Sequence, residues 1–449
     1  MIGAAPLIPD TASIRDALQN LTQTGLGLVC IGEASGKVVG VASDGDLRGA
    51  LLAGAVLGDS VANVMNRNFV SVHEGAPREF VLKLFDTRVK VAPILDGAGR
   101  FLSMATRDYS GGGGSLYARA KAPVRLSLAG GGTDITRHFM KHDSVCLSVT
   151  MARYSHVLLK KRHDRSVKFI SQDLKRNVEA PSLDVTEYDG VLDLIKAGAR
   201  LMRPEYGFEL TTACDFPLGS GLGGSATLLA SVIACFNEFR AEKLGPYEIA
   251  EHAFEAERIE LGIAGGWQDQ YATVFGGLNF LEFNVNRNLV VPIRTSNATL
   301  WELEERLLIC HTGQEHLGDV VHEKLRERSG EEDYLEFSLA VSDIAQRMRD
   351  NLLRGNLTGF GKLLHETWEL KKRYSPGATS AKLDEIYDLA FRSGAEGGRL
   401  LGTGGGGFFL FFVEPLRWHD LANVLRARGL AVDSVILDTE GLRSWTVAA

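Results

Sequence analysis

The chain has 449 residues, 45% of them hydrophobic and 23% charged, with a formal net charge of −7. That composition is ordinary for a soluble globular protein, and the length suits two or three domains. The acidic balance excludes a general affinity for nucleic acid, although local basic pockets for phosphate groups are compatible with it.

Five cysteines are scattered along the chain with no CxxC spacing, which favours reduced thiols and a cytoplasmic location. No basic segment precedes Asp10, so we expect no secretory signal. The apolar run at 222–236 is too short and too rich in small residues to span a bilayer. We therefore expect no membrane partner.

Residues 1–110 contain an imperfect internal repeat with a period of roughly 60 residues. In each copy a helical pattern precedes two short strands, at 13–25, 26–31 and 36–47 in the first copy and at 77–88, 89–95 and 99–109 in the second. A unit of this size cannot bury its own apolar faces, so we predict that the two copies pack together.

This repeat, with its segments DGDLRGALLAG and VMNRNFVSV, resembles a tandem CBS pair, a regulatory module. The resemblance implies an adenine nucleotide bound through a Ser or Thr and an Asp three residues later, here Ser43 and Asp46. In the second copy Thr106 aligns with Ser43, but Tyr109 stands where the Asp would be. The resemblance also implies a homo-oligomer formed through the module. A packing or dimerisation module without a ligand is the alternative.

The stretch SGGGGS that follows has almost no side chains to pack and predicts a flexible linker, placed at 111–116. Beyond it strands and helices are mixed, which indicates an α+β fold. Strands are predicted at 121–131, 146–162, 166–173, 208–214, 276–283, 306–313 and 404–413. Helices are predicted at 246–262, 334–355 and 360–374, and Ile249, Ala253, Ala256 and Ile259 recur at helical spacing in the first.

Residues 217–227 read PLGSGLGGSAT and directly precede an apolar run, so a glycine loop leads into a helix. Glycines let backbone N–H groups converge on a phosphate without obstruction by Cβ, and the helix N-terminus adds partial positive charge. A serine at that junction can ligate Mg²⁺. The loop lacks the lysine of GxxxxGK[ST], so it is not a P-loop. A flexible turn ahead of a core helix is the alternative interpretation.

Three other segments supply charged side chains. Arg125 and Asp134 lie in APVRLSLAGGGTD, Glu257 lies in the predicted helix at 246–262, and Asp269 lies in a glycine-flanked loop. Phosphoryl transfer needs a carboxylate that binds a metal ion, a base and a cation, all beside a phosphate-binding loop. The alternatives are a loop-capping role for Asp269, a solvated helix position for Glu257, and a cap of the following segment for Asp134.

The segments APVRLSLAGGGTD, PLGSGLGGSAT and LLGTGGGGFFLFFV, in that order, resemble the three motifs of the GHMP kinases. Within that superfamily AGGGTD, AERIELGIAGGWQDQYATVFGG and HETWELKK are most similar to the D-glycero-D-manno-heptose 7-phosphate kinase group, which is related to L-fucokinase. The resemblance implies an N-terminal lobe like domain 2 of ribosomal protein S5 at 117–298 and a ferredoxin-like C-terminal lobe at 299–449. An α/β tandem CBS module at 1–110 precedes them.

The resemblance also assigns roles to single residues. Asp269 would activate or orient the acceptor hydroxyl with Arg125 beside it, Ser225 and Glu257 would ligate Mg²⁺, and Asp134 would bind sugar hydroxyls. Further substrate contacts would come from Gly132, Thr133 and Lys372. ATP would be bound by Pro217, Gly219, Ser220, Gly221, Leu222, Gly223, Gly224, Ser225, Ala226, Gly404, Gly405 and Gly406.

Two positions depart from the family pattern. Gly224 replaces the first serine of GLGSSA, and Trp267 replaces the lysine of GGKQDQ, which leaves the phosphate contact of the acceptor open. The basic run Lys371, Lys372 and Arg373 is either a site for a substrate phosphate or a solvated helix face.

We therefore predict an enzyme that uses ATP and Mg²⁺ to phosphorylate the anomeric hydroxyl of D-glycero-D-manno-heptose 7-phosphate, in a route to activated heptose for surface polysaccharide. One alternative keeps the fold and changes the acceptor to L-fucose or another free sugar. Another is a non-catalytic sensor of nucleotide or sugar.

Overall fold

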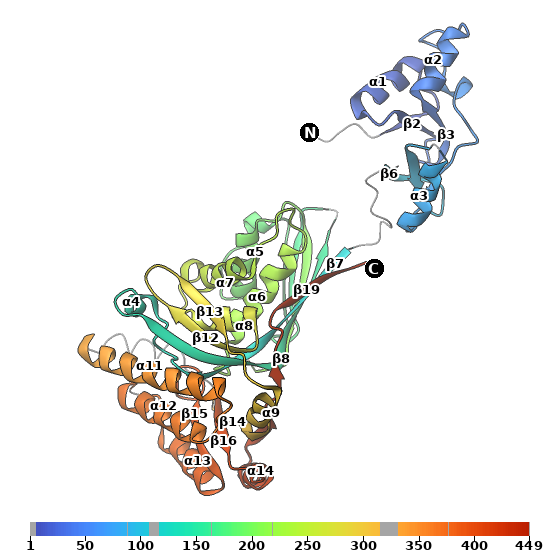
Figure 1. Ribbon diagram of the computed structural model, residues 1–449. Coiled ribbons are helices and arrows are strands. Elements are labelled where there is room, and N and C mark those ends of the chain that lie inside the picture. Colours follow the sequence, from blue (N-terminus) through green and yellow to red (C-terminus); the bar gives the residue numbers. More distant parts are fainter. Residues whose placement is uncertain are drawn as a thin grey trace. The chain divides into compact units, whose positions relative to one another are not determined.

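The computed structural model describes residues 6–87, 89–106, 116–162, 164–217, 219–314, 331–375 and 377–448. The chain divides into two compact units, the first from Met1 to Ser115 and the second from Leu116 to Val447 (Figure 1). The predicted linker at 111–116 lies outside the described residues, except that Leu116 begins a long strand.

The first unit consists of two similar halves. Its elements are β1 (Leu7–Pro9), α1 (Ile14–Thr24), β2 (Leu28–Gly32), β3 (Val38–Ser43), α2 (Asp44–Leu52), η1 (Val61–Asn63), β4 (Val72–His73), α3 (Arg78–Asp86), β5 (Ala92–Leu95) and β6 (Phe101–Ala105). Each half has a three-stranded sheet, β1-β2-β3 or β4-β5-β6, in which the first pair is parallel and the second antiparallel. The predicted internal repeat is therefore confirmed.

The two halves share a small apolar core. Cys30, Val38 and Val41 of the first half are buried against Leu95, Phe101 and Met104 of the second, among others. The backbone N–H of Val38 also donates to the carbonyl of Gly99 at 3.0 Å. This shared core confirms that the two copies pack together.

Ser43 and Asp46 form the N-terminal cap of α2. The backbone N–H of Asp46 donates to Ser43 Oγ at 3.2 Å, while the N–H and hydroxyl of Ser43 donate to Asp46 Oδ2 at 2.8 and 2.6 Å. This reciprocal arrangement is a capping box, which satisfies free N–H groups at a helix start. Tyr109, the departure in the second copy, lies outside the described residues.

The second unit has two sheets. Its strands are β7 (Leu116–Ala129), β8 (Ser144–Lys161), β9 (Val167–Ser171), β10 (Arg176–Ala180), β11 (Phe208–Cys214), β12 (Leu278–Phe283), β13 (Asn288–Pro292), β14 (Leu307–His311), β15 (Ala395–Leu400), β16 (Phe408–Val413), β17 (Ala431–Ser434), β18 (Leu437–Asp438) and β19 (Arg443–Ala448). The seven strands predicted from the sequence are confirmed.

Helices cover these sheets. They are α4 (Thr136–Phe139), η2 (Leu183–Val185), α5 (Asp193–Met202), α6 (Gly224–Asn237), α7 (Pro246–Phe254), η3 (Glu255–Glu260), α8 (Gln268–Phe275), α9 (Asn297–Arg306), α11 (Glu331–Leu353), α12 (Phe360–Tyr374), α13 (Ala381–Arg392) and α14 (Trp418–Ala427). The mixture of sheets and helices confirms the predicted α+β class.

The large sheet has the order β10-β9-β11-β8-β12-β13, with β7 and β18 also paired to β8 and β19 paired to β7. Helices α5 to α8 lie on one of its faces (Figure 1) and bury the first apolar core of the unit with it. The small sheet, β15-β16-β14-β17, is covered by α12 and α13.

A second apolar core joins the two sheets. Leu126 and Val149 of the large sheet pack in one buried cluster with Ile309 and Leu410 of the small sheet and with Met348 of α11. Apolar burial of this kind is the main stabilising contribution in folding. It fixes the two lobes of the unit relative to each other, and thereby the loops that lie between them.

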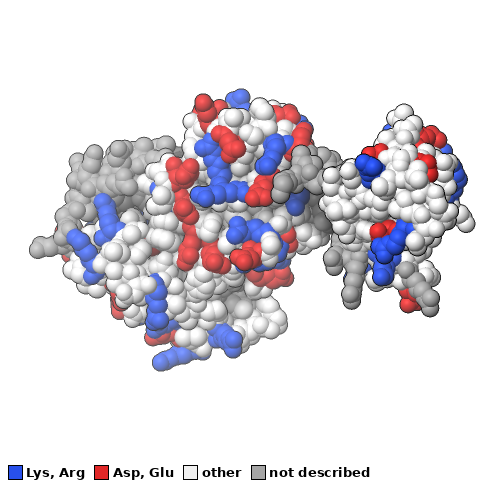
Figure 2. Space-filling view, turned by 90° about the horizontal axis from the view of Figure 1, so that it is seen from above, with Lys and Arg blue, Asp and Glu red and all other residues white. Residues whose placement is uncertain are grey.

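Among the helices of the described residues, none is both long enough and apolar enough to cross a bilayer. On the face drawn in Figure 2, basic and acidic side chains are interspersed among the coloured residues. That face offers no broad surface of one sign among the residues that the structure describes.

Candidate active site

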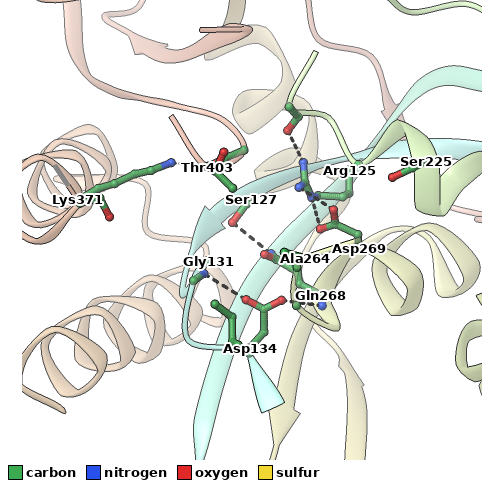
Figure 3. Close-up of a pocket in the computed structure, with 18 of the residues that line it drawn as sticks. Arg125, Ser127, Gly131, Asp134, Ser225, Ala264, Gln268, Asp269, Lys371 and Thr403 are labelled. Atoms are coloured by element: carbon green, nitrogen blue, oxygen red, sulfur yellow. Dashed lines mark hydrogen bonds and ion pairs between the residues drawn. The ribbon is translucent and has the colours of Figure 1, made fainter. Parts of the chain in front are cut away.

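A cavity of about 520 Å³ lies between the two lobes of the second unit. It is lined by parts of all three glycine segments, by Glu257 and Asp269, and by residues of α11 and α12 (Figure 3). Its volume falls in the range usual for small-molecule sites. Segments that are far apart in the sequence thus meet in one pocket.

The second glycine segment forms the wall beside α6. Gly219, Gly221 and Gly223 have φ angles of 67°, 76° and 77°, a region that L side chains rarely adopt. A Cβ on Gly221 would lie 2.9 Å from the carbonyl oxygen of Leu401. No side chain among the described residues caps α6, so its first N–H groups are available to an anion.

Packing against a neighbouring ring explains why residue 224 is a glycine. A Cβ at Gly224 would lie 2.6 Å from Cε2 of Phe216, so a serine there would require the ring to move. The departure from GLGSSA is therefore matched by a neighbouring aromatic ring. Gly224 itself lines the cavity, which keeps the backbone accessible.

Ser225 and Glu257 face each other across the pocket wall. The hydroxyl of Ser225 donates to Oε1 of Glu257, and Nε2 of Gln270 donates to Oε2 at 2.8 Å. Glu257 is 1% exposed, and burial raises the pKa of its carboxyl group. A solvated helix position, the alternative for this residue, is therefore wrong.

The chain around Glu257 is not the regular helix that the sequence predicts. After α7 the backbone forms a π-helical turn, η3, which inserts an additional residue into the turn. Ile249, Ala253 and Ala256 are buried as expected, but Ile259 is 71% exposed because the turn shifts the register. Glu257 follows Ala253 by four residues and lies on the same buried face.

Asp269 and Arg125 form a bidentate ion pair. Nε and Nη2 of Arg125 donate to the two carboxylate oxygens at 2.8 and 3.0 Å. Nη1 donates to the carbonyl of Gly221 at 2.6 Å and so links the pair to the glycine loop. Asp269 lies in the first turn of α8 rather than in a loop, which corrects the expectation and gives it a rigid support.

Asp134 connects the first glycine segment to α8. Its Oδ1 accepts from the N–H of Gly132 at 3.1 Å, and its Oδ2 accepts from the N–H of Gln268 at 2.9 Å. The side chain is 6% exposed and lines the cavity, and burial raises its pKa. Gly132 also lines the cavity, but Thr133 does not, because its hydroxyl donates to the carbonyl of Gly130 at 2.8 Å.

The third glycine segment contacts the cavity through residues that precede the predicted ones in the sequence. Gly402 and Thr403 line it, whereas Gly404, Gly405 and Gly406 do not. A Cβ on Gly404 would lie 2.6 Å from Cα of Ala378, so this glycine permits close packing of the loop rather than ligand contact. These three glycines are therefore placed beside the site and not in its wall.

Three other predicted contacts of ATP also lie outside the cavity wall. Leu222 is buried in the second apolar core, Ala226 is buried, and Pro217 is exposed. Leu222 contributes through its backbone, since its carbonyl accepts from the N–H of Arg125 at 3.2 Å. Side chains at these positions support the loop instead of facing a ligand.

The basic run on α12 divides between two faces. Lys372 lies outside the wall, and its ammonium pairs with Glu369 at 2.6 Å, so its expected role as a substrate contact is corrected. Lys371 and Arg373 line the cavity instead. Lys371 and Lys372 point about 100° apart on the helix, which separates these two neighbours.

Trp267 does not line the cavity either. Its ring stacks on Phe254 with centroids 3.5 Å apart, and its indole N–H donates to Thr136 Oγ1 at 2.8 Å. The residue in place of the family lysine is thus part of the structural support. The cavity nevertheless contains cations from other elements, among them Arg399 and Lys371.

Sequence reasoning missed several residues of the wall. Arg399 directly precedes the third glycine segment, and Tyr334 and Phe337 lie in the first turns of α11. The hydroxyl of Tyr334 donates to the carbonyl of Gly132 at 2.5 Å. The sequence signal available for Arg399 was an arginine within a buried strand pattern. The helical pattern of α11 gave no signal for Tyr334 and Phe337.

Comparisons with known proteins identify the family of this chain. The family models described as "GHMP kinases N terminal domain" and "GHMP kinases C terminal" match residues 193–277 and 348–427, and the CBS domain model matches 1–53 and 61–108. The chain is 38% identical over 335 residues to D-glycero-alpha-D-manno-heptose 7-phosphate kinase of Campylobacter jejuni, covering 73% of this chain and 99% of that protein. The chain belongs to the GHMP kinases. It also carries CBS domains at its N-terminus.

Two further relatives place this GHMP kinase among enzymes named for sugars. It is 30% identical over 213 residues to the bifunctional fucokinase/GDP-fucose pyrophosphorylase of Arabidopsis thaliana, covering 46% of this chain and 20% of that one. The crystal structure of a D-glycero-D-manno-heptose 1-phosphate kinase from Bacteroides thetaiotaomicron aligns with a TM-score of 0.63 and 29% identity, covering 74% of this chain and all of that one. The prediction of a GHMP-type kinase that uses ATP is confirmed.

The donor set near Ser225 suits a magnesium ion. The described residues contain no group of three His, Cys, Asp or Glu side chains that could hold a metal by themselves. Mg²⁺, however, is usually bound by one or two protein oxygens together with substrate phosphates and water. Ser225 and Glu257 offer adjacent oxygens beside the open N-terminus of α6, so they fit such an ion.

Proposed function

We propose that this GHMP kinase transfers the γ-phosphoryl group of ATP to the anomeric hydroxyl of D-glycero-D-manno-heptose 7-phosphate. The reaction would occur in the cytoplasm and supply activated heptose for surface polysaccharide. The observation that carries the proposal is the Arg125–Asp269 pair, which lies between the uncapped end of α6 and Asp134. The 38% identity to a heptose 7-phosphate kinase supports the choice of acceptor.

In the proposed reaction the anomeric oxygen forms a bond to the γ-phosphorus, and the bond to the bridging oxygen of ADP breaks. The hydroxyl proton passes to the carboxylate of Asp269, which Arg125 holds in place through two hydrogen bonds. Asp134 would accept a hydrogen bond from another sugar hydroxyl. Backbone N–H groups of the glycine loop and of α6 would bind the phosphates of ATP.

Ser225 and Glu257 would hold Mg²⁺, which when bound neutralises charge on the phosphate oxygens. Because the Ser225 hydroxyl donates to Glu257, this pair arranges two oxygen donors within one short stretch of the wall. The chain's own contribution is thus positioning and charge placement, which account for most of the catalysis in phosphoryl transfer.

We also propose that the N-terminal module binds an adenine nucleotide near Ser43 and Asp46 and forms a homo-oligomer. The capping box leaves further acceptor capacity on both side chains, which suits ribose hydroxyls. Titration of AMP into the full chain, with the kinase pocket saturated by a non-hydrolysable ATP analogue, tests the first part. No heat of binding would refute it.

A panel of acceptors tests the proposed reaction. Mg·ATP is supplied with heptose 7-phosphate, the unphosphorylated heptose, L-fucose and galactose, and consumption of each is measured with the position of the new phosphate. Turnover of heptose 7-phosphate to the 1,7-bisphosphate is expected. Turnover of L-fucose alone would favour the second candidate, to which the fucokinase relative points. ATP binding without any transfer would favour a sensor.

A further inference from the structure

Two cations of the C-terminal lobe are buried in the pocket wall without a carboxylate partner among the described residues. Lys371 is 7% exposed and Arg399 is 2% exposed, and both line the cavity. The ammonium of Lys371 donates to the carbonyls of Gly402 and, at 3.4 Å, Leu400. Nη1 of Arg399 donates to the carbonyl of Leu128 at 3.2 Å, and its Nε is buried with no partner in the described part of the chain.

Buried charge of one sign is unfavourable unless a counter-charge compensates it. Burial lowers the pKa of Lys371 well below its usual value, and the nearby Arg399 and Arg125 lower it further. Burial also lowers the pKa of Arg399 to about 10. Asp269 is already engaged by Arg125, so the wall retains an excess of positive charge that an anionic ligand would compensate.

The two cations lie on the acceptor side of the pocket. A Cβ at Gly131 would lie 3.6 Å from Nη2 of Arg399, which places the guanidinium beside the loop that carries Asp134. Figure 3 shows Lys371 extending from its helix towards Thr403, on the side of the Arg125–Asp269 pair opposite to Ser225. The phosphates of ATP belong to the Ser225 side, so these cations face a different anion.

We propose that Lys371 and Arg399 form an anion subsite for a phosphate group that the acceptor already carries. The acceptor class is then a sugar phosphate, since a neutral sugar offers no charge to compensate two buried cations. This inference rests on the proposed function for the position of the acceptor. Lys371 and Arg399 also supply, from other elements of the fold, the positive charge that the family pattern would place at the position of Trp267.

The test uses Lys371→Met, which removes the charge and keeps a long, unbranched side chain. Lys372→Met is the matched control, because its ammonium pairs with Glu369 outside the cavity. Acceptors are compared in pairs that differ only in the phosphate, beginning with heptose 7-phosphate and the same heptose without it. In the Lys371 variant we expect KM for the phosphorylated acceptor to rise about 10- to 100-fold, the range for a charged hydrogen bond. Its kcat at saturation and the KM for the unphosphorylated acceptor should change less than about threefold.

Equal losses of kcat on both acceptors would overturn the subsite, since Lys371 would then act on the transferred group. An unchanged KM would overturn it as well. If neither heptose is consumed, the proposed acceptor fails, and calorimetry decides the subsite independently. Inorganic phosphate is titrated into protein saturated with Mg²⁺ and a non-hydrolysable ATP analogue. Binding by the wild type and the Lys372 variant, but not by Lys371→Met or Lys371→Gln, supports the subsite; equal binding by all, or none by the wild type, refutes it.

Discussion

Replacing Asp269 by Asn removes the proposed base while leaving the shape of the site almost unchanged. Arg125 is 7% exposed and donates two hydrogen bonds to the carboxylate, which is 22% exposed. An asparagine offers one carbonyl oxygen to one of these N–H groups and turns an NH₂ group, a donor, towards the other. The buried guanidinium therefore loses its counter-charge and one of its acceptors.

Two magnitudes follow from this geometry. Breaking a buried ion pair by removing one partner costs about 3–5 kcal/mol, and the partial exposure of Asp269 reduces the expected loss of unfolding free energy to about 2–4 kcal/mol. For the chemical step, loss of a positioned base lowers kcat about 10²- to 10⁴-fold. At 1.36 kcal/mol per decade this is about 3–5 kcal/mol of transition-state stabilisation.

Release of ADP at saturating Mg·ATP and acceptor gives kcat, and chemical denaturation gives the free energy of unfolding. The double variant Arg125→Gln/Asp269→Asn is the control, because a neutral pair restores hydrogen bonding without restoring the base. We expect it to regain part of the stability and none of the turnover. A kcat within threefold of wild type in the Asp269→Asn protein would refute the assigned role.

Four further outcomes are expected from other parts of the molecule. Ser225→Ala should raise the Mg²⁺ concentration for half-maximal rate about tenfold or more, measured at fixed ATP; an unchanged Mg²⁺ dependence would contradict the ligand role. Gly266→Ala should raise KM for the acceptor while KM for ATP stays constant, because the new Cβ would collide with the carboxylate of Asp134; equal effects on both substrates would count against the separation of the two sides. Burial raises the pKa of Asp134, so its contribution to the unfolding free energy is present below its ordinary pKa of about 3.9 and is lost as pH rises through the raised value. Asp134→Asn should flatten that part of the stability profile, and an identical profile would show that another group titrates there. Ser43→Ala should cost the N-terminal module about 1 kcal/mol through loss of the cap, with the kcat of the kinase unchanged; an unchanged melting transition would show that the cap contributes nothing.

Local patterns in the chain were enough to predict most of the elements. Alternation identified β8 and β9, and the repeat in the first 110 residues predicted two halves that pack together. Such patterns are readable because burial of one face imposes a period of two on a strand and 3.6 on a helix. The glycine segments were equally visible, since positive φ angles at Gly219, Gly221 and Gly223 restrict the residue type.

The exposure of Ile259 was not readable in the same way. Its spacing from Ala253 and Ala256 predicts a buried position, and the π-helical turn η3 turns it outwards, whereas Glu257, four residues after Ala253, stays on the buried face. Such a turn depends on how the helix packs against its neighbours. Likewise, Lys371 and Lys372 have identical side chains, and only the packing of α12 against β15 decides which of them lines the cavity.

The sequence alone therefore determined the order of the three glycine segments and the presence of Ser225, Glu257 and Asp269 near them. The tertiary structure decided that Arg125 binds Asp269 across 144 positions, that Arg399 enters the wall, and that Gly404 to Gly406 remain behind it. The reason is physical: local spacing governs which face of an element is buried, whereas contacts between distant elements depend on how their buried faces fit together.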